Sequence, residues 1–139
     1  MKRSVNKVFV GGCFDILHFG HIRFLKKAKS LGDYLIIALE SDTRVRELKG
    51  KGRPIHTQKQ RKEILESLKF VDEVMILKDK MTDEDYYNLV KNVHPYLIAT
   101  TKGDPQLGKK KVQAKIIGAK VVIISKTKSP STTEIIKKK

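Results

Sequence analysis

Residues 8–21, which read VFVGGCFDILHFGH, decide the fold of this chain. They begin with an apolar run, Val8 to Val10, which ends at two glycines and is too continuous for a half-exposed strand. Tyr34 to Leu39 repeats this type, and between the two runs residues 24–31 place their apolar side chains on one helical face. The stretch and its surroundings therefore predict two buried parallel strands joined by a crossover helix.

The alternation of strand-like and helix-like segments continues along the chain and predicts an α/β fold, in which helices cover a parallel sheet. Residues 49–57 contain two glycines and a proline and are predicted to form a mobile loop. The chain of 139 residues has room for one domain, residues 1–139. Further strands are predicted at 74–77, 97–100 and 121–124, and helices at 58–68, 83–93 and 109–117, with a last short helix capped by Ser131 or Thr132.

The net charge of +15 comes from 30 basic and 15 acidic side chains and favours anionic partners. Two kinds of partner fit this charge, a nucleic acid and a small phosphate-rich substrate, while Lys109–Lys111 and Lys137–Lys139 are equally typical of a solvated surface. The sequence has neither an apolar signal core nor the run of about 20 apolar residues that spans a membrane, so we expect a cytoplasmic protein without a membrane partner. Cys13 is the only cysteine, which excludes an intrachain disulfide and a four-thiolate metal site within one chain.

The exit of the first strand concentrates groups that bind ligands. Parallel sheets bind ligands beyond the carboxyl ends of their strands, where helix N-termini point their amides outward. This exit carries paired glycines, an acid and two histidines, but it has neither the G-x-G-x-x-G spacing nor a Walker A loop. His18 and His21 share one face if a helix begins near His18, with Gly20 between them leaving space. We therefore expect two imidazoles to meet a phosphate here.

Two histidines beside a phosphate suit an attack on an α-phosphorus that expels pyrophosphate. Catalysis of that reaction consists mainly of positioning and of stabilising charge on the phosphate oxygens. The ordinary pKa of histidine is about 6.5, and a triphosphate would favour the charged ring, which donates a strong hydrogen bond. Two other roles stay open. The histidines can merely cap or pack the helix, and Cys13, His18 and His21 could hold zinc, although a fourth ligand is lacking.

Residues 12–21, GCFDILHFGH, resemble the first signature of the cytidylyltransferase-like nucleotidyltransferases. The resemblance spans nearly the whole chain and is greatest to the adenylyltransferase domain of ADP-heptose synthases. It implies a Rossmann-like five-stranded parallel sheet with helices on both faces, a nucleoside triphosphate bound with Mg²⁺, and in-line attack by a sugar or alcohol phosphate. The further stretches that carry it are Leu48-Lys49-Gly50, Arg53-Pro54, Gln60-Arg61, Val71-Asp72 and Ser131-Thr132-Thr133-Glu134-Ile135-Ile136-Lys137-Lys138.

The resemblance also implies roles for single residues. His18 and His21 would hold the triphosphate and its transition state. Lys49 would reach the α-phosphate from the other side, a role that Lys51 or Arg53 could take instead. Mg²⁺ would be held by the nucleotide phosphates. Further nucleotide contacts would come from Gly12, Cys13, Phe14, Asp15, Gly20, Lys102, Gly103, Asp104, Ser131, Thr132 and Thr133.

Several of these residues have a second interpretation. Arg53 and Arg61 would bind the acceptor or a phosphate, but Arg61 is almost as typical of a helix surface. Asp15 could orient the backbone or help to hold Mg²⁺, or it could satisfy the amides of a turn. The G-G-D-Y stretch of heptose adenylyltransferases appears here as residues 102–105, KGDP, which leaves the base and the acceptor open.

The leading function is transfer of AMP from ATP to a phosphorylated acceptor, such as a heptose phosphate, with release of pyrophosphate. The same mechanism with other substrates, CTP with glycerol phosphate or ATP with flavin mononucleotide, remains an alternative. A basic RNA-binding module related to tRNA synthetases is a third, which is disfavoured because the chain lacks an anticodon-reading region. A homodimer is implied only by the resemblance.

Overall fold

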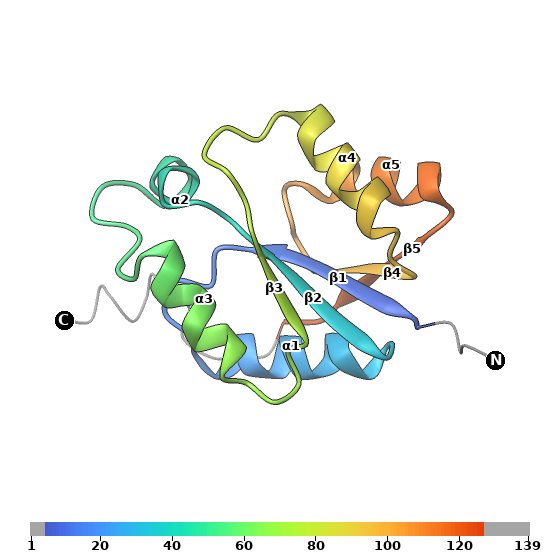
Figure 1. Cartoon of the computed structure of the whole chain (residues 1–139), viewed down its shortest axis with the longest axis horizontal. Helices are drawn as coiled ribbons and strands as arrows, with labels where there is room; N and C mark the ends of the chain where they lie inside the picture. The colour runs from blue at the N-terminus through green and yellow to red at the C-terminus, as the bar shows by residue number, and fades with distance from the viewer. Residues whose placement is uncertain (1–4, 127–139) are drawn as a thin grey trace.

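A five-stranded parallel sheet forms the centre of the computed structural model, which describes residues 5–126 (Figure 1). The strands stand in the order β3-β2-β1-β4-β5, and every pairing between neighbours in this sheet is parallel. The predicted α/β class and its five strands are therefore confirmed. The strands are β1 (Lys7–Gly12), β2 (Tyr34–Leu39), β3 (Glu73–Ile76), β4 (Leu97–Thr101) and β5 (Lys120–Ile124).

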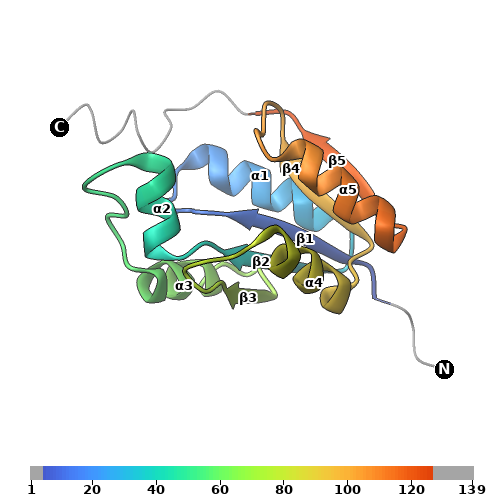
Figure 2. The same cartoon turned by 90° about the horizontal axis from the view of Figure 1, so that it is seen from above.

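Helices cover both faces of the sheet, as the resemblance implies. In Figure 1, α1 and α3 lie below the sheet and α4 and α5 above it, and Figure 2 shows the same layers from another side. Because alternate side chains of a strand point to opposite faces, Val8 and Val10 pack in the core beside α1 and α3, while Phe9 packs in the core beside α4 and α5. The helices are α1 (Phe19–Ser30), α2 (Asp42–Lys49), α3 (Gln58–Glu66), α4 (Asp83–Val93) and α5 (Leu107–Ile117).

The direction of strand addition reverses at β1. The chain first adds β2 and β3 on one side of β1 and then returns to add β4 and β5 on the other side. The crossovers that leave β1 and β4 therefore run to opposite faces of the sheet, which opens a crevice between the carboxyl ends of these two strands. This crevice is where a doubly wound sheet binds its ligand.

Helix α2 is an element that the sequence pattern does not predict. Of its eight residues only Val45 is buried, so no apolar stripe marks it in the sequence. Ser41 caps its start by accepting a hydrogen bond from the Arg44 amide at 3.1 Å. Lys49 is consequently the last residue of a helix, where the sequence predicts a mobile loop.

Candidate functional site

A cavity of about 470 Å³ lies at the carboxyl edge of the sheet, in the crevice between β1 and β4. Its walls come from the exits of β1, β4 and β5, the first turn of α1 and the end of α2. The size and position suit a nucleotide-sized ligand. The residues proposed from the sequence that line it are Gly12, Cys13, Phe14, Asp15, His18, Gly20, His21, Lys49, Arg53, Gly103 and Asp104.

His18 and His21 together form the N-terminal cap of α1. The Nδ1 atom of His18 accepts a hydrogen bond from the Gly20 amide at 3.1 Å, and the Nδ1 atom of His21 accepts one from the His18 amide at 3.3 Å. This is a reciprocal capping box built from two imidazoles. The rings stack with their centroids 3.9 Å apart and their planes 28° apart. Capping, one of the alternatives to a ligand site, is therefore a real role of this pair, and both rings also line the cavity.

The cap fixes the tautomer of both rings. A neutral imidazole whose Nδ1 accepts a hydrogen bond carries its proton on Nε2. Burial, the charge of His18 and the charge of Lys49 lower the pKa of His21 to about 4, although a hydrogen bond with the Ile16 backbone opposes the shift. Without a ligand the His21 ring is thus neutral at pH 7, and a bound polyanion would be needed to favour its charged form.

Phe14 supports the histidine turn from the side of the strand exit. Its backbone has a φ of 45°, which is rare for a residue other than glycine, and its ring is buried. The ring meets the edge of His21 with the centroids 5.4 Å apart. A Cβ atom on Gly12 would lie 2.6 Å from the Phe14 ring, so any larger residue here would force this ring to shift.

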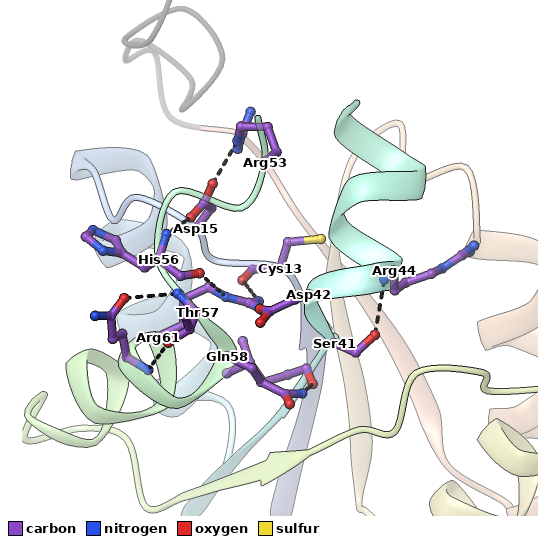
Figure 3. A network of polar contacts seen from close by, with 12 residues as sticks. Cys13, Asp15, Ser41, Asp42, Arg44, Arg53, His56, Thr57, Gln58 and Arg61 are labelled. Carbon is purple, nitrogen blue, oxygen red and sulfur yellow. Dashed lines mark hydrogen bonds and ion pairs between the residues drawn. The ribbon is translucent and has the colours of Figure 1, made fainter. Parts of the chain in front are cut away.

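Asp15 ties the exit of β1 to the segment that follows α2 (Figure 3). Its carboxylate accepts hydrogen bonds from Arg53 Nε at 2.7 Å and from the amides of Ile55 at 2.8 Å and His56 at 3.0 Å. Burial alone would raise the pKa of Asp15, but these donors hold it below its usual value. Residues 53–57, predicted as part of a mobile loop, are therefore anchored, and Asp15 satisfies turn amides as one of its interpretations required.

Arg61 is fully buried, contrary to the helix-surface interpretation. It does not line the cavity but lies behind its wall. Its Nη1 atom donates to the carbonyl oxygen of Cys13 at 2.7 Å, its Nη2 atom pairs with Asp42 at 2.7 Å, and its Nε atom donates to the carbonyl oxygen of His56 at 3.1 Å. The structure thus gives Arg61 a supporting position, because these acceptors all belong to the protein.

Lys49 faces the histidine turn from the end of α2. It lines the same cavity as His21 and Cys13, and its charge lowers the pKa of both groups. The thiol of Cys13 nevertheless has a raised pKa, because burial outweighs the charge of Lys49 and of nearby arginines. The turn and Lys49 therefore form two walls of one cavity, while Lys51 is exposed outside it.

Asp104 lies in a polar cluster at the exit of β4. One carboxylate oxygen contacts Lys110 Nζ at 2.5 Å and Thr100 Oγ1 at 2.6 Å, and the other accepts from the Gln106 amide at 2.8 Å. Burial opposes ionisation, but these partners lower the pKa of Asp104. Lys110 and Thr100 line the cavity and are missed by the sequence analysis. Lys110 stands in a run of three lysines, which is typical of a solvated surface.

Three further predictions concern residues that the structure places elsewhere or does not describe. Lys102 is exposed and does not line the cavity. Ser131, Thr132 and Thr133 and the helix predicted there lie outside the described residues. Within residues 5–126, no group of three or more His, Cys, Asp and Glu side chains is arranged to hold a metal ion, which leaves the zinc interpretation without support from geometry.

No helix within residues 5–126 is long and apolar enough to cross a membrane.

The doubly wound sheet and a cavity walled by a histidine turn and a lysine agree with the fold and the site that the family resemblance implies. The chain belongs to the cytidylyltransferase-like family, whose family model matches residues 9–138. The family resemblance of the sequence is therefore confirmed.

Curated relatives are longer proteins. The bifunctional protein HldE of Campylobacter fetus is 45% identical over 132 residues, which are 94% of this chain and 27% of that protein. The HldE protein of Nitratiruptor sp. is 42% identical over 137 residues, which are 99% of this chain and 28% of that protein. The chain thus spans about a quarter of the length of these relatives.

Solved structures share the fold. A lipopolysaccharide core biosynthesis protein from Thermoplasma volcanium superposes with a TM-score of 0.72 at 28% identity, covering 91% of this chain and 99% of that one. A pantoate-beta-alanine ligase from Francisella tularensis has a TM-score of 0.63 at 19% identity, covering 94% of this chain and 62% of that one, and shows the fold alone.

Proposed function

We propose that this chain transfers AMP from ATP to a sugar phosphate and releases pyrophosphate. The observation that carries the proposal is the stacked pair of His18 and His21, which faces Lys49 across a cavity at the reversal of strand order. Because Nδ1 of each ring already accepts an amide hydrogen bond, neither neutral ring offers a lone pair to a metal ion, and the pair suits phosphate oxygens better. The likeness to the adenylyltransferase domain of ADP-heptose synthases supports ATP as the nucleotide.

In this reaction a phosphate oxygen of the acceptor attacks the α-phosphorus of ATP. A new P–O bond forms as the bond between the α-phosphorus and the bridging oxygen of the β-phosphate breaks, and pyrophosphate carries away the electron pair. The histidines donate hydrogen bonds to the phosphate oxygens on which charge accumulates, and Lys49 acts from the opposite wall. A triphosphate would raise the pKa of His21, so the ring gains charge where the transition state needs it.

Mg²⁺ is the divalent ion that we propose for the reaction. The described residues offer no cluster of carboxylates for it, and Asp15 is already engaged by Arg53. Mg²⁺ commonly binds through substrate phosphates and water, so the described residues fit an ion that arrives bound to the nucleotide. When bound, it would neutralise part of the triphosphate charge.

The acceptor and the assembly rest on likeness to relatives. A sugar phosphate agrees with the lipopolysaccharide core biosynthesis protein of Thermoplasma volcanium, which covers nearly the whole of this chain. A homodimer is proposed on the family resemblance alone, and sedimentation equilibrium would test it.

A thermal-shift panel with ATP, CTP and GTP, each with and without Mg²⁺, tests the nucleotide. A ligand at about a hundred times its dissociation constant stabilises a protein by roughly 2.7 kcal/mol. We expect ATP with Mg²⁺ to raise the Tm most. A pyrophosphate-release assay over a set of sugar phosphates, glycerol phosphate and flavin mononucleotide then identifies the acceptor. A larger shift with CTP, and turnover only with glycerol phosphate, would replace this proposal by the cytidylyltransferase alternative.

A further inference from the structure

The cavity extends across the end of β1 to the face of the sheet that α4 and α5 cover. Phe9 and Ile98 point to this face and pack in its core. Side chains alternate along a strand, so Gly11 and Thr100, which stand two residues further on, point to the same face. Both line the cavity, as does Lys110 of α5. The cavity therefore has one lobe at the histidine turn of α1 and a second lobe under α5.

The second lobe has space at its floor. A Cβ atom on Gly11 would meet only the carbonyl oxygen of Ala38, at 4.0 Å. The neighbouring residue on β4, Thr100, is polar and buried. The lobe is thus open above β1 and lined by a hydroxyl on one side, which suits a hydrophilic ligand.

Lys110 brings the positive charge to this lobe. Its Nζ atom contacts Asp104 at 2.5 Å and Thr100 at 3.3 Å. These contacts place the ammonium at the exit of β4, the strand that pairs with β1. An ammonium has three donors, so one remains for a ligand after Asp104 and Thr100 are satisfied.

The stereochemistry of the proposed reaction assigns the leaving pyrophosphate to one lobe and the acceptor to the other. In an in-line displacement the entering oxygen and the leaving group stand on opposite sides of the phosphorus. If the pyrophosphate leaves toward His18 and His21 at the start of α1, the acceptor approaches from the side away from α1. The lobe with Gly11 and Lys110 is on that side.

We propose that Lys110 binds the phosphate of the acceptor, in a subsite formed over Gly11 beside Thr100. The assignment rests on the proposed nucleotidyl transfer. Asp104 then holds the ammonium in place, and the ligand of this lobe is a small phosphorylated polyol or sugar.

Steady-state kinetics of the full chain test this assignment, with the acceptor that gives the fastest pyrophosphate release. A lost charge-assisted hydrogen bond corresponds to about a tenfold to hundredfold loss of affinity. We expect Lys110→Met to raise the KM of the acceptor by this factor while the KM of ATP changes less than about twofold, and Lys110→Arg to restore part of the loss. Lys111→Met, which changes an exposed lysine of the same helix, is the matched control and should behave as wild type.

One outcome of these kinetics would overturn the assignment. A raised KM for ATP with an unchanged KM for the acceptor would show that Lys110 serves the nucleotide through Asp104. If the wild-type chain releases no pyrophosphate with any acceptor, the proposed function fails, and thermal shifts with ATP and with inorganic phosphate take over as the readout. If Lys110→Met loses only the rise in Tm that inorganic phosphate gives, the result still supports an anion subsite. If it loses only the rise in Tm that ATP gives, the result contradicts this subsite.

Asp104 keeps Thr100 and Gln106 as partners, so the variant should fold, which urea unfolding verifies.

Discussion

The guanidinium of Arg61 donates a hydrogen bond of 2.7 Å to the backbone carbonyl of Cys13, 48 residues earlier in the chain. This bond joins α3 to the exit of β1, directly behind the wall of the cavity. A second bond from the same side chain reaches the carbonyl of His56, in the segment that Asp15 anchors. One buried side chain thus holds together two loops that border the cavity.

Arg61→Met should destabilise the protein without acting on the chemistry. The variant leaves two carbonyls and Asp42 without their donor, and the loss of a buried charged partner costs about 3 kcal/mol. Urea unfolding should show a lower midpoint. Lys62→Met, which removes only a surface pair with Glu66, should change the free energy of unfolding by less than about 1 kcal/mol. An unchanged midpoint together with a raised KM for the acceptor would instead show that Arg61 binds substrate.

Removal of either imidazole should abolish most of the activity even when the helix cap is preserved. Asn is a good N-cap residue, and Gln at the third helical position completes a capping box, so His18→Asn and His21→Gln keep the start of α1. Loss of one transition-state donor costs about 3 to 4 kcal/mol, a hundredfold to thousandfold in kcat. Pyrophosphate release measures the rate, and circular dichroism verifies the helix. Full activity of His18→Asn would disprove the proposed mechanism.

The free energy of unfolding should fall as the pH drops from about 6.5 to about 4. In this range an unfolded chain protonates His21, whose ordinary pKa is about 6.5, while the folded chain, with a pKa of about 4, does not. The unfolded state therefore binds more protons, and stability decreases by up to about 1.4 kcal/mol for each pH unit. Urea titrations at several pH values measure this slope. His21→Gln should reduce it, and an identical slope in both proteins would refute the assignment to His21.

Gly12→Ala should damage both stability and activity. Its new Cβ atom would lie 2.6 Å from the buried Phe14 ring, and that ring supports His21. Overpacking of this kind costs about 1 to 3 kcal/mol. Gly11→Ala, whose new Cβ atom would meet only a carbonyl oxygen at 4.0 Å, is the control for stability. Equal Tm values for the two variants would mean that Phe14 moves aside freely.

Lys49 and Lys51 can be separated by matched substitutions. Lys49→Met removes the charge that acts on His21 and should lower kcat about a hundredfold, as expected for a lost electrostatic donor. Lys51→Met changes an exposed residue outside the cavity and should leave kcat within about twofold. The same pyrophosphate assay measures both. If Lys51→Met is the impaired variant, the roles of the two lysines are exchanged.

The centre of the sheet was predictable because β1, β2 and β4 are buried on both faces, and such strands are nearly continuous apolar runs. Helix α2 was not predictable, because a short helix with the single buried side chain of Val45 has no periodicity to detect. Because α2 ends at Lys49, its position decides where Lys49 lies. The failure to predict this helix therefore affects only one wall of the cavity.

The part of the site that is contiguous in the sequence was predictable, and the part that depends on long-range pairing was not. Residues 12–21 carry both histidines and the glycines in one stretch. The burial of Arg61, in contrast, depends on acceptors up to 48 residues away, and nothing near it in the sequence marks them. Lys110 likewise differs from its neighbouring lysines through its contacts with Asp104 and Thr100.

The anchoring of residues 53–57 by Asp15 also bears on how substrates reach the cavity. The amides of Ile55 and His56 and the side chain of Arg53 all bind one buried carboxylate, so this rim cannot swing outward without breaking every one of these bonds. The anchored rim should therefore keep its position while nucleotide and product enter and leave the cavity.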